Sequence, residues 1–105
     1  MGSRVIAGKE VQLTENGFLV DPQDWTREMA LEIAKEEGIE IMTEAHWGII
    51  DFCRQEGLEA GKAPSLRAIV NGTGVSMKAL FELFPKSPDK KVALISGLRM
   101  AARCI

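Results

Sequence analysis

Few side chains of this sequence could act as nucleophiles or redox groups: two cysteines, Cys53 and Cys104, and one histidine, His46. Cys104 is the most informative, because a cysteine next to the last residue can be carried on a terminal arm into the active site of another protein. The thiolate is the form that attacks sulfur. Arg99 and Arg103 favour that form and the terminal carboxylate opposes it, so the direction of the shift in the thiol pKa is left open. The alternative is that Cys104 has no function.

Cys53 is expected to lie in a helix, on or beside the apolar face that also carries Trp47. A buried cysteine behaves as a small hydrophobic residue, so we interpret Cys53 as part of the core, with a redox or ligand role as the alternative. His46 precedes it by two helical turns, roughly 10 Å along the axis, which is too far for a nucleophile–base pair. We expect His46 to be a half-buried structural imidazole. Because the sequence has only two cysteines and one histidine, no metal site is predicted.

Length, charge and composition narrow the class of protein. A chain of 105 residues with 46% hydrophobic and 27% charged residues is expected to form a single globular domain. The net charge of −2 argues against a protein that mainly coats nucleic acid or acidic membranes. No apolar run approaches the roughly 20 residues of a membrane span and no export signal is evident, so we expect a cytoplasmic protein with both thiols reduced. Cofactor-binding motifs are absent, and no cofactor is predicted.

Short β-rich segments fill the first 20 residues. Segments 4–6 and 10–13 are separated by turn-forming residues 7–9, and Asn16-Gly17 is a strong turn signal ahead of segment 18–20. These features predict a β-hairpin or a three-stranded meander over residues 1–20. Because so few strands are marginally stable alone, their apolar face is expected to lie on helices.

Five helices are predicted after this region, over residues 26–37, 43–60, 65–72, 76–84 and 87–96. Thr43 and Ser87 are expected to cap helices, and Pro88 suits a first helical position. The predicted fold class is therefore α+β and mostly α, with a small N-terminal hairpin packed on a bundle of about five helices. We expect one globular domain over residues 1–97 (hairpin 1–20, bundle 24–97), followed by a flexible C-terminal arm over residues 98–105.

The third and fourth predicted helices form a helix-turn-helix-like unit. The run from Ser65 to Phe84, with Gly74-Val75-Ser76 in its turn, resembles the DNA-binding unit of the TetR-type repressors. A small DNA-binding regulator is therefore the alternative function. The second helix of the unit carries one basic residue, Lys78, beside Glu82, whereas neutralising a nucleic-acid backbone usually takes several. Since three helices commonly pack in this way, we favour a structural role and expect no nucleic-acid partner.

Motifs spread over nearly the whole chain suggest one family. They are Gly17-Phe18-Leu19-Val20-Asp21-Pro22 with Asp24-Trp25, Ile33-Ala34-Lys35-Glu36-Glu37-Gly38-Ile39, Thr43-Glu44 with His46-Trp47, Ala63-Pro64 with Arg67, Leu80-Phe81-Glu82-Leu83-Phe84-Pro85, and Gly97-Leu98 with Cys104-Ile105. In these motifs the sequence resembles the DsrC/TusE family. That family contains the gamma protein of dissimilatory sulfite reductase and the sulfur-relay proteins of tRNA thiolation. The resemblance implies a hairpin on a helical bundle with a C-terminal arm. This fold agrees with the strands and helices predicted above from the spacing of apolar residues.

The resemblance implies a carrier that works with partner enzymes rather than a self-sufficient catalyst. In the family the penultimate cysteine, here Cys104, accepts sulfur as a persulfide and delivers it from the arm. The implied partners are sulfurtransferases and, for some members, a sirohaem sulfite reductase. We expect Arg99 and Arg103 to support the thiolate and steer the arm. Arg67 is a further candidate for contact with an anion or a partner, with a solvated surface role as its alternative. A third interpretation of the protein's function is a structural subunit whose arm only docks, without sulfur chemistry.

The sequence departs from the family pattern at three places. The second arm cysteine of the sulfite-reductase type aligns with Ala93, so the chain resembles the single-cysteine branch and no disulfide within the arm is expected. The Pro-Lys-Pro of the family's arm corresponds to Arg99-Met100-Ala101, and segment 69–80 is several residues shorter than in typical members.

Overall fold

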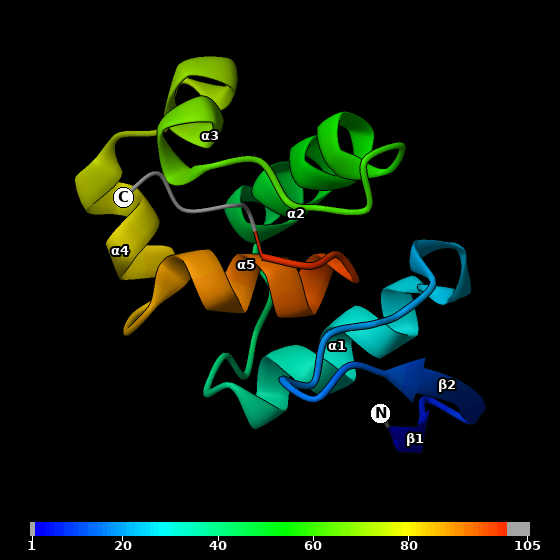
Figure 1. Ribbon diagram of the computed structural model, residues 1–105. Helices are drawn as coiled ribbons and strands as arrows, with labels where there is room; N and C mark the ends of the chain where they lie inside the picture. The colour runs from blue at the N-terminus through cyan, green and yellow to red at the C-terminus, as the bar shows by residue number, and fades with distance from the viewer. Residues whose placement is uncertain (1, 101–105) are drawn as a thin grey trace.

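The computed structural model describes residues 2–100 and contains an antiparallel hairpin, a short 3₁₀ helix and five α-helices (Figure 1). In chain order these elements are β1 (Gly2–Ile6), β2 (Lys9–Leu13), η1 (Pro22–Asp24), α1 (Arg27–Glu36), α2 (Glu44–Gly57), α3 (Leu66–Thr73), α4 (Met77–Leu83) and α5 (Pro88–Ser96). The predicted fold class and the five predicted helices are thus confirmed.

A tight turn at Ala7 and Gly8 closes the hairpin. Their φ angles of +51° and +82° match the two-residue turn whose twist follows the right-handed twist of the strands. The chain turns again at Asn16-Gly17, as expected, but the third strand of the possible meander is reduced to one bridge between Leu13 and Leu19. The hairpin interpretation is therefore the correct one.

Apolar burial attaches the hairpin to the helices. Ile6 and Val11 are each about 1% exposed and pack in one cluster with Met29 of α1. At the rim, the hydrogen bond from Arg4 lowers the pKa of the Glu36 carboxyl from its ordinary value. Exposed pairs of this kind contribute only about 0–1 kcal/mol, so the apolar contact is the main attachment.

Hydroxyl side chains begin four of the five α-helices: Thr26, Thr43, Ser65 and Ser76 each accept a hydrogen bond from the backbone N–H three residues later. The predicted cap at Ser87 is wrong, because this residue is left-handed (φ +54°) and makes no capping hydrogen bond. Pro88 does occupy the first helical position, where no N–H donor is needed. Helix α2 ends at Gly57 rather than near residue 60, because residues 58–61 form a turn in which Gly61 donates to the Gly57 carbonyl over 2.8 Å.

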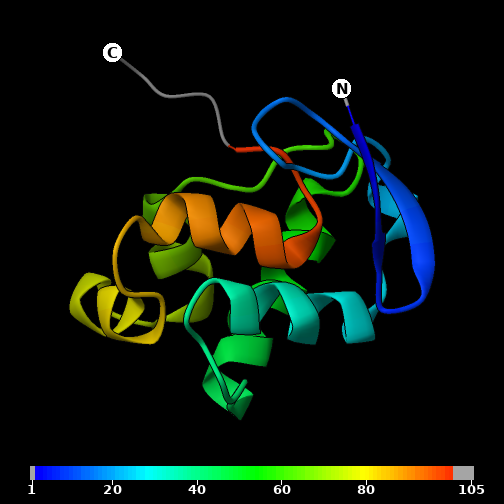
Figure 2. The same ribbon diagram turned by 90° about the horizontal axis from the view of Figure 1, so that it is seen from below.

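Helix α5 forms the centre of the helical part. Its buried Val92, Ala93 and Ile95 belong to the main core, and α5 lies between α1 and α2 (Figure 1). Helices α3 and α4 form one end of the bundle, and the hairpin lies at the opposite end against α1 (Figure 2). Within residues 2–100, no helix is long and apolar enough to cross a membrane.

Candidate functional site

The structure describes only some of the predicted site residues. Cys104 and Arg103 lie outside the described residues, so the position of the persulfide stays a prediction. Arg67 and Arg99 are described, and both are exposed. Arg67 lies in the first turn of α3, as the helix predicted from residue 65 implies, whereas Arg99 follows α5. They come from different elements, and no hydrogen bond joins their side chains.

Residues 97–100, which we call the C-terminal anchor, are built into the globular part of the protein. Leu98 is fully buried. The N–H of Arg99 donates to the carbonyl of Gly61 over 3.0 Å, and the carbonyl of Arg99 accepts from the N–H of Ala63 over 2.8 Å, so that a short parallel bridge forms. The expectation of an arm that begins at residue 98 is therefore corrected, because residue 98 belongs to the core and residue 99 is held by backbone hydrogen bonds.

Trp25 and Arg54 hold the end of α5 in place. The Nε1–H of Trp25 donates to the carbonyl of Ile95 over 2.7 Å. Nη1 of Arg54 donates to the carbonyls of Pro22 (3.0 Å) and Ser96 (3.1 Å), and its guanidinium lies 4.4 Å from the centre of the Trp25 ring. Burial lowers the pKa of Arg54 from its ordinary value, yet a guanidinium stays charged. The cation therefore also complements the negative end of the α5 dipole.

Two glycines allow this close packing. Gly97 has φ +72°, and a Cβ at this residue would lie 2.5 Å from Cδ1 of Trp25. A Cβ on Gly57, the last residue of α2, would collide with the carbonyl oxygen of Lys62 and lie 2.9 Å from Cδ1 of Leu98. Both positions therefore require glycine, and the close packing around them fixes the position of the C-terminal anchor.

Sequence reasoning assigned no positioning role to Arg54 or Gly57. One signal was available: Gly57 follows the core residue Cys53 by four positions, so both lie on the same side of α2. A glycine on the buried side of a helix marks a close approach of another backbone. Nothing local, however, indicated that the approaching segment would be the turn at residues 58–63 together with Leu98.

Cys53 and His46 both have structural roles, as predicted. Cys53 is fully buried in the main cluster, and burial raises the pKa of its thiol to about 12. His46 is buried rather than half-buried, and its ring is satisfied at both nitrogens: Nδ1 accepts from the N–H of Thr43 (3.1 Å) and Nε2 donates to the carbonyl of Leu83 (2.9 Å). The imidazole thus caps α2 and ties it to the end of α4.

The Cys53 thiol is expected to be inert in the folded protein. In a Cys104→Ala variant, Ellman's reagent at pH 8 should detect no thiol until denaturant is added, because the reactive thiolate is suppressed and the site is closed. The raised pKa also predicts that stability is complete below pH ~8.5, the ordinary thiol pKa, and falls as pH rises toward 12. The free energy of unfolding, measured by chemical denaturation, should fall with rising pH in this way relative to Cys53→Ala. Rapid labelling of Cys53 in the native protein would contradict its burial.

Other candidate sites in the described part of the chain are weak. Among residues 2–100, no group of three His, Cys, Asp or Glu side chains could hold a metal ion. A pocket of about 180 Å³ lies between the hairpin, α1 and α5, with Arg4, Glu36 and Lys90 in its lining. Neither of the described site residues, Arg67 and Arg99, lines it.

The fold and the C-terminal anchor define a class: a small α+β protein with an N-terminal hairpin, five helices with α5 at their centre, an α5 end held by Trp25 and Arg54, and an anchor bonded to Gly61 and Ala63. The sequence profile of the family described as "DsrC like protein" matches residues 5–105. The chain belongs to this DsrC-like family, and the resemblance found in the motifs is confirmed.

Relatives and solved structures agree with this membership. The sulfurtransferase TusE of Sodalis glossinidius (strain morsitans) is 34% identical over 105 residues, 93% of this chain and 96% of its own. TusE of Escherichia coli (strain K12) is 32% identical over 108 residues, 96% of this chain and 98% of its own. The crystal structure of dissimilatory sulfite reductase I (DsrI) matches with a TM-score of 0.85 and 32% identity over 99% of this chain and 100% of that chain. The oxidized gamma-subunit of the dissimilatory sulfite reductase (DsrC) from Archaeoglobus fulgidus matches with a TM-score of 0.81 and 30% identity. This match covers 99% of this chain and 100% of that chain.

Proposed function

We propose that this protein is a sulfur carrier that accepts sulfur as a persulfide on Cys104 and relays it between sulfurtransferases and an acceptor in sulfur metabolism or tRNA thiolation. Two relatives that match over most of their length are named sulfurtransferases. The observation that carries the proposal is the burial of Cys53, with its thiol pKa raised to about 12. It leaves Cys104, four residues after the C-terminal anchor, as the thiol for exchange.

The transfer step needs neither oxidant nor reductant. The Cys104 thiolate attacks the terminal sulfur of the donor's persulfide, and a bond forms between Sγ of Cys104 and that sulfur. The S–S bond to the donor cysteine breaks, and the donor leaves as a thiolate. The transferred atom keeps its oxidation level, and the proton of the persulfide moves with it. In this proposal Arg99 and Arg103 stabilise the attacking thiolate by charge, and Arg67 contacts the partner.

Sulfurtransferases are the proposed partners, and a reducing cytoplasm is the proposed compartment. A sirohaem sulfite reductase is a further proposed partner, because two matching structures are titled as a dissimilatory sulfite reductase and its gamma-subunit. The carrier itself is proposed to use no cofactor.

Intact mass tests the proposal. After incubation with a persulfide donor, the protein should gain roughly 32 Da, the mass of one sulfur atom on a thiol. The gain should disappear on treatment with dithiothreitol, because a reducing thiol removes the outer sulfur as sulfide. A protein that gains no mass from any persulfide donor would not be a sulfur carrier.

The DNA-binding alternative is not favoured. The unit α3–turn–α4 is present, but the family is not one of repressors, and α4 carries a single basic residue, Lys78. In a titration with mixed-sequence DNA duplexes at physiological salt, we expect no sub-micromolar affinity, because so few cations release few counterions. Tight sequence-selective binding that is lost on changing Lys78 would reverse this assignment.

A further inference from the structure

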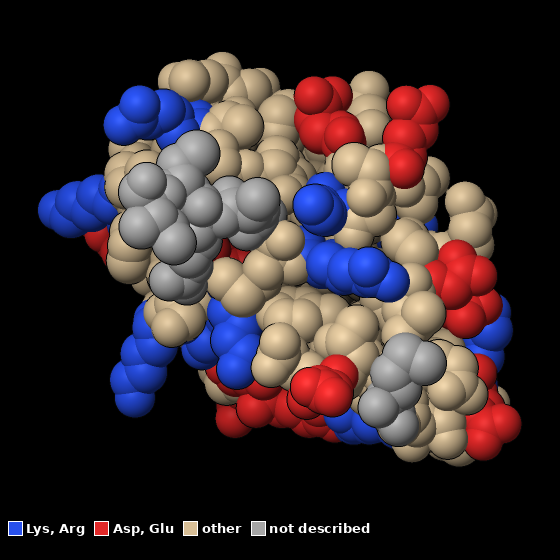
Figure 3. Space-filling view, viewed as in Figure 1, with Lys and Arg blue, Asp and Glu red and all other residues tan. Residues whose placement is uncertain are grey.

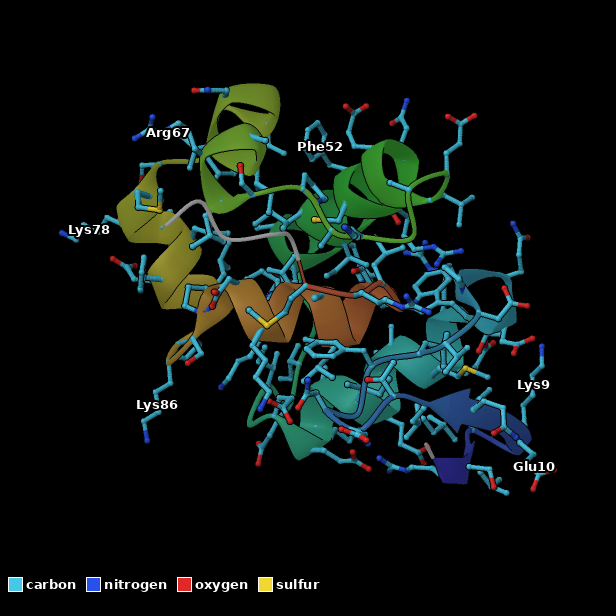
Figure 4. The ribbon with its side chains drawn as sticks, viewed as in Figure 1. Lys9, Glu10, Phe52, Arg67, Lys78 and Lys86 are labelled. Atoms are coloured by element: carbon cyan, nitrogen blue, oxygen red, sulfur yellow. The ribbon has the colours of Figure 1, made fainter. Side chains whose placement is uncertain are left out.

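Three cations are exposed at the end of the bundle formed by α3 and α4. Arg67 of α3, Lys78 of α4 and Lys86 of the α4–α5 loop all extend from this side of the protein (Figure 4). The ion pairs found in residues 2–100 all lie elsewhere, in the hairpin, η1, α1 and α2. The three charges are therefore available to an outside partner.

Two large apolar side chains are exposed beside these cations. Phe81 is 49% exposed and Met77 is 41% exposed, and they lie one turn apart on α4. Exposed aromatic and methionine side chains next to arginine are typical of protein–protein interfaces, whose cores are enriched in these three residue types. Together, Arg67, Met77, Lys78, Phe81 and Lys86 form what we call the basic surface.

Charge is distributed unevenly over the protein. In the space-filling view, Asp and Glu lie over the right and lower parts of the visible face, whereas Lys and Arg extend from the left side, where α3 and α4 lie, and also cover part of the centre (Figure 3). On the exposed side of α4, Glu82 offsets part of the charge of Lys78. Three cations therefore lie at this end with two nearby carboxylates, Glu82 and Asp89 in the first turn of α5, although the whole chain has a net charge of −2.

We propose that the basic surface docks an acidic patch on the sulfur-donating protein. The inference rests on the proposed carrier function and adds the partner's chemistry to it. A nucleic acid fits less well, because the exposed Phe81 and Met77 gain nothing from a phosphate backbone and three cations are few for one. An acidic protein surface with an apolar hollow satisfies both the charges and the two apolar side chains.

The place of the basic surface suits this role. Met100, at the end of the C-terminal anchor, packs against the same core cluster that contains Ile69 of α3 and Leu80 of α4. The anchor residue Arg99 is also hydrogen-bonded to Gly61 and Ala63, in the segment that leads into α3, so a partner that covers α3 docks near the point where the anchor is attached. Docking and sulfur transfer then use neighbouring parts of the protein without sharing residues.

Two sulfur donors separate docking from chemistry. One is glutathione persulfide, which needs no docking surface; the other is an acidic rhodanese-type sulfurtransferase charged with thiosulfate. The test variant is Arg67→Glu/Lys78→Glu, and the matched control is Lys35→Glu/Lys90→Glu, which changes the net charge equally at exposed positions on α1 and α5 that form none of the ion pairs described above. With the protein donor, the test variant should raise KM at least ~10-fold with little change in kcat, and Phe81→Ala should raise it several-fold.

The remaining outcomes decide the inference in either direction. Loading from glutathione persulfide should be unchanged in every variant, and added salt should raise KM for the wild-type protein but not for the test variant. Equal KM values for the test and control variants would overturn the proposal, as would a mixed-sequence duplex that competes with the donor at physiological salt. If neither donor loads Cys104, the carrier function fails. Titration calorimetry of the two proteins then decides docking: binding lost only in the test variant supports it, and equal or absent binding overturns it.

Discussion

Cys104→Ala is expected to abolish sulfur loading while the protein stays folded. The substitution should remove the whole gain of roughly 32 Da seen by intact mass, because no other reactive thiol is available in the native state. Cys53→Ala should do the reverse: loading persists, and stability falls by about 1 kcal/mol or more, because a filled core site loses a sulfur atom. Mass spectrometry and thermal unfolding on the two variants measure both effects.

A truncation gives the control for this pair. Ending the chain after Met100 should mimic Cys104→Ala, because the C-terminal anchor is kept. Ending it after Leu98 should also lower the thermal midpoint, because the two backbone hydrogen bonds of Arg99 are lost, each contributing about 1 kcal/mol. Sulfur found on Cys53 while Cys104 stays bare would refute the carrier assignment without touching the fold.

Gly57→Ala is expected to destabilise the protein, against the general preference of helices for alanine. An added Cβ collides with the carbonyl oxygen of Lys62 and presses on Leu98, so the 58–63 turn or the C-terminal anchor must move. Overpacking of this kind typically costs about 1–3 kcal/mol. For a domain of this size, 2 kcal/mol corresponds to a fall in Tm of about 8–16 °C.

Gly48→Ala in the same helix is the matched control. A Cβ at this exposed position meets nothing within 4 Å, so the lower backbone entropy of alanine should stabilise the protein by about 0.5–1 kcal/mol. Opposite signs for the two substitutions, read by chemical denaturation, support the close packing at the C-terminal anchor. A gain in stability at both positions would contradict it.

Local signals predicted most of the fold. Thr43, Ser65 and Ser76 begin helices where expected, because a hydroxyl that accepts from a nearby N–H depends only on neighbouring residues. Ser87 failed as a cap because its backbone, like that of Lys86, is left-handed, in the short connection that leads from α4 into the buried helix α5. The types of the neighbouring residues do not reveal a backbone conformation that the rest of the fold imposes.

The candidate site was predicted less completely. Gly97 does end α5, but the glycine gave no sign that Leu98 would re-enter the core, because its partners come from α2 and the 58–63 turn, some 40 residues away. The role of Arg54 could not be predicted for the same reason, because its acceptors, the carbonyls of Pro22 and Ser96, are distant from it in sequence. Contacts between backbone groups distant in sequence leave no pattern in residue type.

In the proposed function, the parallel bridge at Arg99 also sets the point from which the distance to the sulfur of Cys104 is counted. Four peptide steps separate Met100 from Cys104 and span at most about 14 Å, whereas seven steps from Gly97 would span about 25 Å. A shorter tether confines the thiol to a smaller space, and its effective concentration at a docked partner rises as that space shrinks. For the proposed carrier, the bridge therefore limits the depth of a partner's active site that Cys104 can reach, and the shorter reach makes encounters within that depth more frequent without any added affinity.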